Sequence, residues 1–195
     1  MRARAVFLCL SAVFLLSGCV GAPPATTQPD MTFANFTPVR LDVAGIEVRG
    51  DYKPPMKEPN VEHTFSTPLY VAVENLVKGK LVASGSENVL RVIIEDASVV
   101  REDLPVTKGF MDVFLTEPSG ILKARILLRF EMVDPQSPDV VLSRAEVTAR
   151  RTRTLMEDDS LADRDRAYLT LTEDMMDDLN DGLTTVVKNA FGKKM

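Results

Sequence analysis

This chain contains no tryptophan, one histidine and two cysteines, and both cysteines lie near its N-terminus. Cys9 and Cys19 cannot cross-link a domain downstream of them, and a single histidine is too few for a Cys/His zinc site or most histidine-dependent catalysis. The formal net charge is −5, whereas a nucleic-acid-binding domain usually needs a basic surface. These shortages argue against a disulfide-stapled scaffold, a zinc site and a nucleic-acid-binding function.

Catalytic motifs are also missing, since the chain has no G-x-S-x-G, H-E-x-x-H, Walker or G-x-G-x-x-G sequence. A catalytic His63 would need an orienting acid, and Glu62 precedes it in the sequence. The side chains of sequence neighbours rarely converge, so we predict that His63 is a surface residue without a catalytic role. The acidic run over residues 173–182 does not fit a calcium loop, because Leu179 and Lys188 fall on ligand positions. We therefore expect no enzymatic activity, no metal, no cofactor and a solvated acidic helix face.

The N-terminus is informative because Arg2 and Arg4 precede twelve residues of which only Ser11 is polar. A charged start and a short apolar run are typical of a secretory signal peptide, and the run is too short for a permanent transmembrane helix of about 20 residues. Residues 16–19, Leu-Ser-Gly-Cys, follow. They resemble the bacterial lipobox, in which cleavage precedes the cysteine; the alternative is a plain secretory signal ending at small residues.

The lipobox resemblance predicts a signal peptide over residues 1–18 and acylation of Cys19, with anchoring by three acyl chains. Loss of Arg2 and Arg4 with the signal changes the formal charge from −5 to −7. Val20 follows the cysteine where aspartate would favour retention in the inner membrane. We therefore expect the protein on the outer membrane, facing the periplasm, with the inner membrane as the less favoured location.

Residues 19–38 predict the lipidated cysteine and a flexible tether, because they hold four prolines and no apolar periodicity. A single domain is expected over residues 39–195. Alternation, helical periodicity and turn residues predict its elements in this order: a strand over 39–49 with a bulge at Gly45, a loop over 50–66, a helix from Thr67-Pro68 to about Ser84, strands over 89–100, 121–133 and 140–154, a short strand or buried loop over 109–116, and a helix from a capping box at Ser160–Asp163 to Ala190. The fold class is α+β, with an antiparallel sheet of about four or five strands and two helices packed on one face.

A basic cluster is expected on the face of this sheet that faces water. Period-two alternation places five cations there, with Arg151 and Arg153 extending the group: Lys123, Arg125, Arg129, Arg144 and Arg150. Arginine suits phosphate, so the cluster could bind an anion. The alternative is cross-strand pairing with Glu131 and Glu146.

The lipobox and the element order together resemble a group of bacterial envelope lipoproteins, the LptE/YajG-like and ABC-transport auxiliary lipoproteins. The resemblance covers the chain after Cys19 and includes no catalytic signature. It implies a non-enzymatic accessory or docking role in outer-membrane or lipid-transport assembly, with an envelope protein complex as partner. Homo-oligomers occur in the group. The basic cluster adds the alternative of binding lipopolysaccharide or another anionic amphiphile, such as a phospholipid.

Overall fold

The computed structural model describes residue 33 and residues 35–105 and 116–191. Cys19, the signal peptide, the tether up to residue 32 and nearly all of the segment expected over 109–116 lie outside these residues. The elements are β1 (Val39–Leu41), β2 (Gly45–Gly50), the 3-10 turn η1 (Glu62–Thr64), α1 (Leu69–Lys80), β3 (Leu81–Ala83), β4 (Val89–Asp103), β5 (Pro118–Asp134), β6 (Ser137–Met156) and α2 (Leu161–Phe191).

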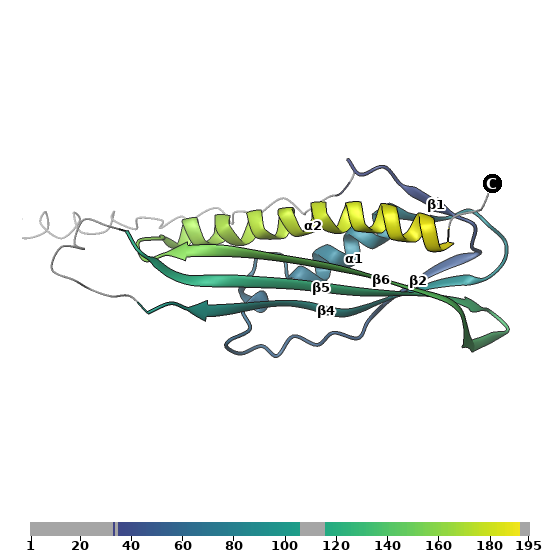
Figure 1. The fold of residues 1–195 in the computed structure, drawn as a ribbon, viewed down its shortest axis with the longest axis horizontal. Coiled ribbons are helices and arrows are strands. Elements are labelled where there is room, and N and C mark those ends of the chain that lie inside the picture. The colour runs from purple at the N-terminus through teal and green to yellow at the C-terminus, as the bar shows by residue number, and fades with distance from the viewer. Residues whose placement is uncertain (1–32, 34, 106–115, 192–195) are drawn as a thin grey trace, which may run out of the picture.

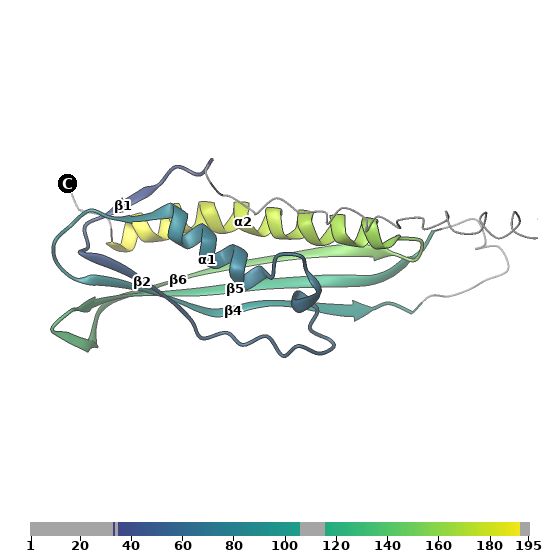
Figure 2. The same cartoon turned by 180° about the vertical axis from the view of Figure 1, so that it is seen from behind.

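The main sheet has the strand order β2-β4-β5-β6, and both helices lie on one of its faces (Figures 1 and 2). The α+β class is confirmed, but the sheet is mixed, because β2 runs parallel to β4 while β4, β5 and β6 form an antiparallel meander. The segment between β2 and β4 contains α1, and a connection of that length can return the chain to the start of a parallel neighbour.

The single strand expected over 39–49 is in fact two strands in two sheets. Residues 39–41 pair with β3 in a separate two-stranded parallel sheet, and residues 45–50 pair with β4. Between them, Gly85 donates its backbone N–H to the Val43 carbonyl at 3.0 Å, and Ala44 donates to the Asn88 carbonyl at 2.8 Å. The change of apolar parity at Gly45 therefore marks a transfer between sheets rather than a bulge.

The first helix is shorter than its sequence suggests. It begins after Pro68 without a side-chain cap and ends at Lys80 rather than near Ser84, because the next three residues form β3. Leu81 and Val82, which continue the apolar pattern past the helix end, belong to β3, whose backbone pairs with β1. Lys80 itself is buried between the helices and donates to Asn180 Oδ1 at 2.5 Å.

The last helix begins at the expected capping box. Ser160 accepts from the Asp163 N–H at 3.2 Å, and Asp163 Oδ2 accepts from the Ser160 N–H at 3.2 Å, which satisfies two donors at the helix start. The Ser160 bonds and Arg166 hold the pKa of Asp163 below its usual value. Apolar residues at three- and four-residue steps predict a buried stripe on this helix that ends at Val186 and Ala190. The stripe is buried at Leu171, Met175, Leu179 and Leu183, but it ends at Val187 and Phe191 instead, and Ala190 is exposed.

Candidate functional site

The face of the sheet that carries no helix is the candidate functional surface. The alternation predicted for β5 and β6 holds in the register: Arg129 lies opposite Glu146, Glu131 opposite Arg144, and Arg125 opposite Arg150. The five predicted cations therefore share this face. Arg151 and Arg153 lie opposite Ala124 and Leu122, residues of the helix-covered face, so they do not extend the cluster as expected.

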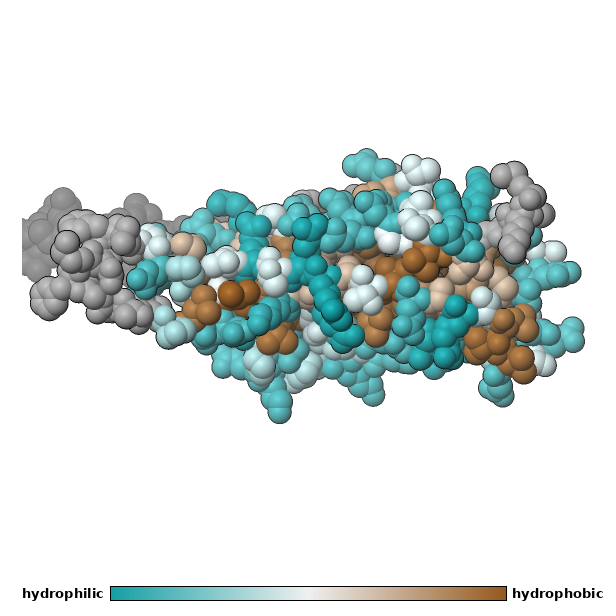
Figure 3. Space-filling view, in the orientation of Figure 1, coloured by the Kyte–Doolittle hydropathy of each residue, from teal (hydrophilic) through white to brown (hydrophobic). Residues whose placement is uncertain are grey.

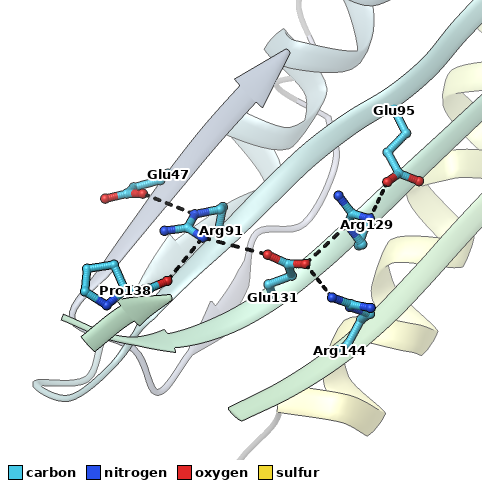
Figure 4. A network of polar contacts seen from close by, with 7 residues as sticks. All are labelled: Glu47, Arg91, Glu95, Arg129, Glu131, Pro138 and Arg144. Atoms are coloured by element: carbon cyan, nitrogen blue, oxygen red, sulfur yellow. Dashed lines mark hydrogen bonds and ion pairs between the residues drawn. The ribbon is translucent and has the colours of Figure 1, made fainter. Parts of the chain in front are cut away.

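Glu131 organises one half of this face. It is buried, with only 8% of its side chain exposed, and three guanidinium groups surround it (Figure 4). Arg144 Nη2 donates to Glu131 Oε1 at 3.0 Å, Arg129 Nε lies 3.3 Å from the same oxygen, and Arg91 Nη1 lies 3.8 Å from Oε2. The latter two are ion-pair contacts without hydrogen-bond geometry in the structure.

The network continues to both sides and joins all four strands. Arg129 pairs with Glu95 at 2.6 Å, and Arg91 pairs with Glu47 of β2 at 3.8 Å. Arg91 also donates to the Pro138 carbonyl at 3.5 Å, which ties it to the start of β6 (Figure 4). Arg91 and Arg129 are each shared between two carboxylates. Arg129 and Arg144 are therefore partners of the buried Glu131 and link neighbouring strands.

The other half of the face holds the remaining three cations. Lys123 pairs with Glu102, and Arg125 donates to Asp96 Oδ2 at 2.9 Å. Arg150 is exposed and lies directly opposite Arg125, and within the described part of the chain no ion pair or hydrogen bond engages its side chain. Like charges opposite each other repel. Arg150 is therefore the predicted site residue with most capacity left for an external anion.

The pairing with glutamate expected from the sequence is found at one of the two acids. Glu131 accepts three arginines as described above. Glu146 lies opposite Arg129 in the register, but Arg129 turns to Glu95 and Glu131 instead, and no described residue pairs with Glu146. Register alone could not indicate this choice, because it depends on where β4 places its own carboxylates.

A second polar cluster lies in the loop expected over 50–66, and no local pattern predicted it. Glu62 is fully buried and accepts from the Tyr52 hydroxyl at 2.5 Å, from the Val99 N–H at 3.1 Å and from Asn60 Nδ2 at 3.3 Å. Burial, followed by the bond to Glu62, raises the pKa of Tyr52 well above its usual value. These bonds fix the loop against β4, which is a structural role.

His63 does not join this cluster. Its side chain is half-buried rather than fully at the surface as expected, and its Nδ1 atom is buried without a partner among the described residues. The acidic run of α2 is mostly exposed, as expected, except that Asp178 accepts two bonds from Arg151 at 2.6 and 2.7 Å. That bidentate bond raises the pKa of Arg151.

The described residues hold no group of three His, Cys, Asp or Glu side chains placed to bind a metal ion. A separate search of the same residues finds no helix with the length and apolar character needed to cross a membrane.

Comparison with known proteins gives structural neighbours but no sequence family. No family model matches the chain, and no curated protein matches it. Solved structures that resemble it include a minor lipoprotein from Acinetobacter baumannii, with 14% identity, 74% of this chain and 90% of that chain covered, and a TM-score of 0.39. Rare lipoprotein B from Shewanella oneidensis has 14% identity, coverages of 72% and 92%, and a TM-score of 0.37.

A third neighbour is a Xanthomonas campestris protein of the DUF330 family, with 14% identity, coverages of 76% and 86%, and a TM-score of 0.37. Two of these three neighbours are thus named as bacterial lipoproteins. At this level of similarity the neighbours do not assign the chain to the LptE/YajG-like group or to any other branch.

Proposed function

We propose that this protein is a non-enzymatic lipoprotein, anchored through Cys19, that acts as an accessory or docking component of a cell-envelope assembly. The observation that carries the proposal is the Leu-Ser-Gly-Cys motif at residues 16–19, placed after a charged and apolar leader and before a proline-rich tether. The open sheet face supports a docking role, because the salt-bridge network around Glu131 presents it as an ordered polar surface rather than a packed core.

Replacement of the acceptor cysteine tests the anchor. Cys19→Ala should abolish labelling with radioactive palmitate in a bacterial host and release the protein from membrane pellets. Cys9→Ala is the matched control, since Cys9 lies inside the predicted signal peptide and should leave both readouts unchanged. Persistent labelling of the Cys19→Ala protein would refute the lipoprotein assignment, and fractionation of wild-type membranes would distinguish the outer from the inner membrane.

Site-specific photocrosslinking in cells tests the docking surface. A photoreactive residue at Thr148, which is exposed on the open face of β6, should capture a discrete envelope protein. The same residue at Asp177, exposed on α2, is the control and should not capture that protein. Equal capture at both positions, or none at Thr148, would contradict docking through this face.

Binding of lipopolysaccharide or another anionic amphiphile is the second candidate function, and Arg150 is the observation that favours it. Its guanidinium has no partner among the described residues and lies opposite Arg125. Anionic vesicles should bind the unacylated Cys19→Ala protein at low salt and release it as salt rises, because exposed charges are screened beyond about 10 Å at 0.1 M.

Arg150→Glu should weaken this binding, whereas Arg49→Glu, an equal charge change at an exposed position on the opposite edge strand β2, should not. Arg129 and Arg144 are poor test positions, because reversal there would also disturb buried Glu131. Cys19→Ala protein with Arg150 intact that ignores anionic lipid at low salt would rule out this candidate. Because the wild-type protein carries its own lipid anchor, the comparison uses the Cys19→Ala background.

A further inference from the structure

The tip of the β5–β6 hairpin exposes three consecutive apolar side chains. Val140 is 52% exposed, Val141 37% and Leu142 53%. They lie within β6 rather than in a flexible connection. The space-filling view shows a brown group at the lower right, where Figure 1 places the end of the β5–β6 hairpin (Figure 3). Soluble proteins scatter single apolar residues over their surfaces, but a continuous exposed run on a strand is usually functional.

The hairpin holds these side chains in place. Val141 pairs with Val133 of β5, and the register shifts between Met132 and Val133, so one extra residue of β6 is accommodated there. A second shift follows between Val133 and Asp134. Such irregularities bend a strand and re-aim side chains, so the alternation of β6 is interrupted here. Arg91 donates to the Pro138 carbonyl, which fixes the start of β6 to the sheet. The apolar tip is thus a preformed feature of the fold.

We propose that this tip, Val140–Leu142, is a membrane-contact site that inserts into the interface of the phospholipid bilayer that anchors the protein. The proposal rests on the anchor proposed above. A protein partner or a second copy would need about 800 Å² of buried surface on each side, which three half-exposed side chains do not supply. A bilayer sets no such minimum, and attachment to it raises the effective concentration of a weak second contact.

The tether allows this contact. The 13 residues from Val20 to Thr32 span at most about 45 Å when extended. The described chain then starts at Phe33 next to the end of α1, where the Lys80 ammonium lies 5.9 Å from the Phe36 ring centroid. Figures 1 and 2 place this start and the hairpin tip in the same half of the molecule along its longest axis.

The start of α2 lies at the other end of the molecule from the hairpin tip (Figure 1). Leu161 follows β6, whose 20 residues run away from the tip over up to about 65 Å. Leu161 is 79% exposed, so it offers an apolar position of similar chemistry that the proposal places away from the bilayer.

The absence of tryptophan from the chain permits a direct test. Full-length acylated protein carrying Leu142→Trp is reconstituted into phosphatidylethanolamine–phosphatidylglycerol vesicles, with and without brominated acyl chains. We expect a blue-shifted emission that brominated lipid quenches. Leu161→Trp, the matched control, should keep the emission of a water-exposed indole and escape quenching. Equal quenching at both positions, or none at position 142, would overturn the proposal.

Two further measurements separate the tip from the anchor. Adding Val140→Ser and Val141→Ser to the Leu142→Trp protein should remove the blue shift and the quenching, while the protein still floats with vesicles through its lipid. Vesicle flotation without tip quenching in the parent Leu142→Trp protein would refute the tip contact and leave the anchor standing. Failure of the acylated protein to float would refute both.

Discussion

Gly182 lies in the middle of α2, where glycine is a poor helix former, and the structure explains its presence. A Cβ atom built on Gly182 would lie 2.9 Å from Val147 Cγ1 of β6, closer than side-chain carbons approach one another in proteins. The helix therefore approaches the sheet through a position that must lack a side chain. Gly182→Ala should destabilise the protein even though alanine favours the helix.

The magnitude follows from two opposing effects. Replacing glycine by alanine in a helix interior gains up to about 1 kcal/mol, whereas overpacking a core contact costs about 1–3 kcal/mol. The net expectation is a loss of about 0–2 kcal/mol. Gly79→Ala is the matched control, because Gly79 also lies in a helix and a Cβ there would meet no atom within 4 Å. That substitution should be neutral or stabilising.

Urea denaturation followed by circular dichroism measures both variants. The informative quantity is the difference between them, about 1–3 kcal/mol in favour of Gly79→Ala. In a Val147→Ala background the obstructing methyl group is absent, so Gly182→Ala should become stabilising relative to that background. A Gly182→Ala protein that is as stabilised as Gly79→Ala would refute the reasoning about close helix–sheet approach.

Three other outcomes follow from the structure. Glu131→Gln should cost about 1.5–3 kcal/mol in urea denaturation, because it removes the buried carboxylate to which Arg144 donates and around which Arg91 and Arg129 are held. A loss below about 1 kcal/mol would contradict the role given to the network. Gly85→Ala should lower the melting temperature severely, since its Cβ would lie 2.6 Å from the Asp42 carbonyl carbon, and a melting temperature equal to wild type would show that the backbone can yield there. Asp163→Asn should lower the melting temperature at neutral pH, because a carboxylate whose pKa is depressed in the folded state stabilises the fold at pH values above its unfolded pKa. The difference in melting temperature from wild type should shrink as the pH falls below about 4. A pH-independent difference would argue against the capping-box bonds with Ser160.

Much of the C-terminal half could be predicted from its sequence, because local patterns determine it. Alternation over 121–133 gave the faces of β5, and the return strand and capping box followed from turn and helix-start residues. The reason for Gly182 could not be predicted, because the residue it approaches, Val147, is distant in sequence.

The N-terminal half was predicted less well, because its structure depends on pairing between distant segments. Residues 39–41 and 45–50 belong to different sheets, and nothing local shows which partner each will find. The parallel pairing of β2 with β4 has the same origin. In the candidate site, the sequence placed the five cations on one face but could not show that Glu95 and Asp96 of β4 would engage two of them.

The position of α2 on the sheet has a consequence for solubility. Strand β6 is an edge strand of 20 residues, and a long free edge readily pairs with strands of other molecules and starts aggregation. Helix α2 packs mainly along β6 and is fastened to it by the bidentate bond between Arg151 and Asp178. A chain shortened before Leu161, by proteolysis or incomplete synthesis, would expose the apolar face of the sheet beside that edge. We expect such fragments to precipitate or be degraded, because the 31 residues of α2 keep the apolar face of the sheet covered.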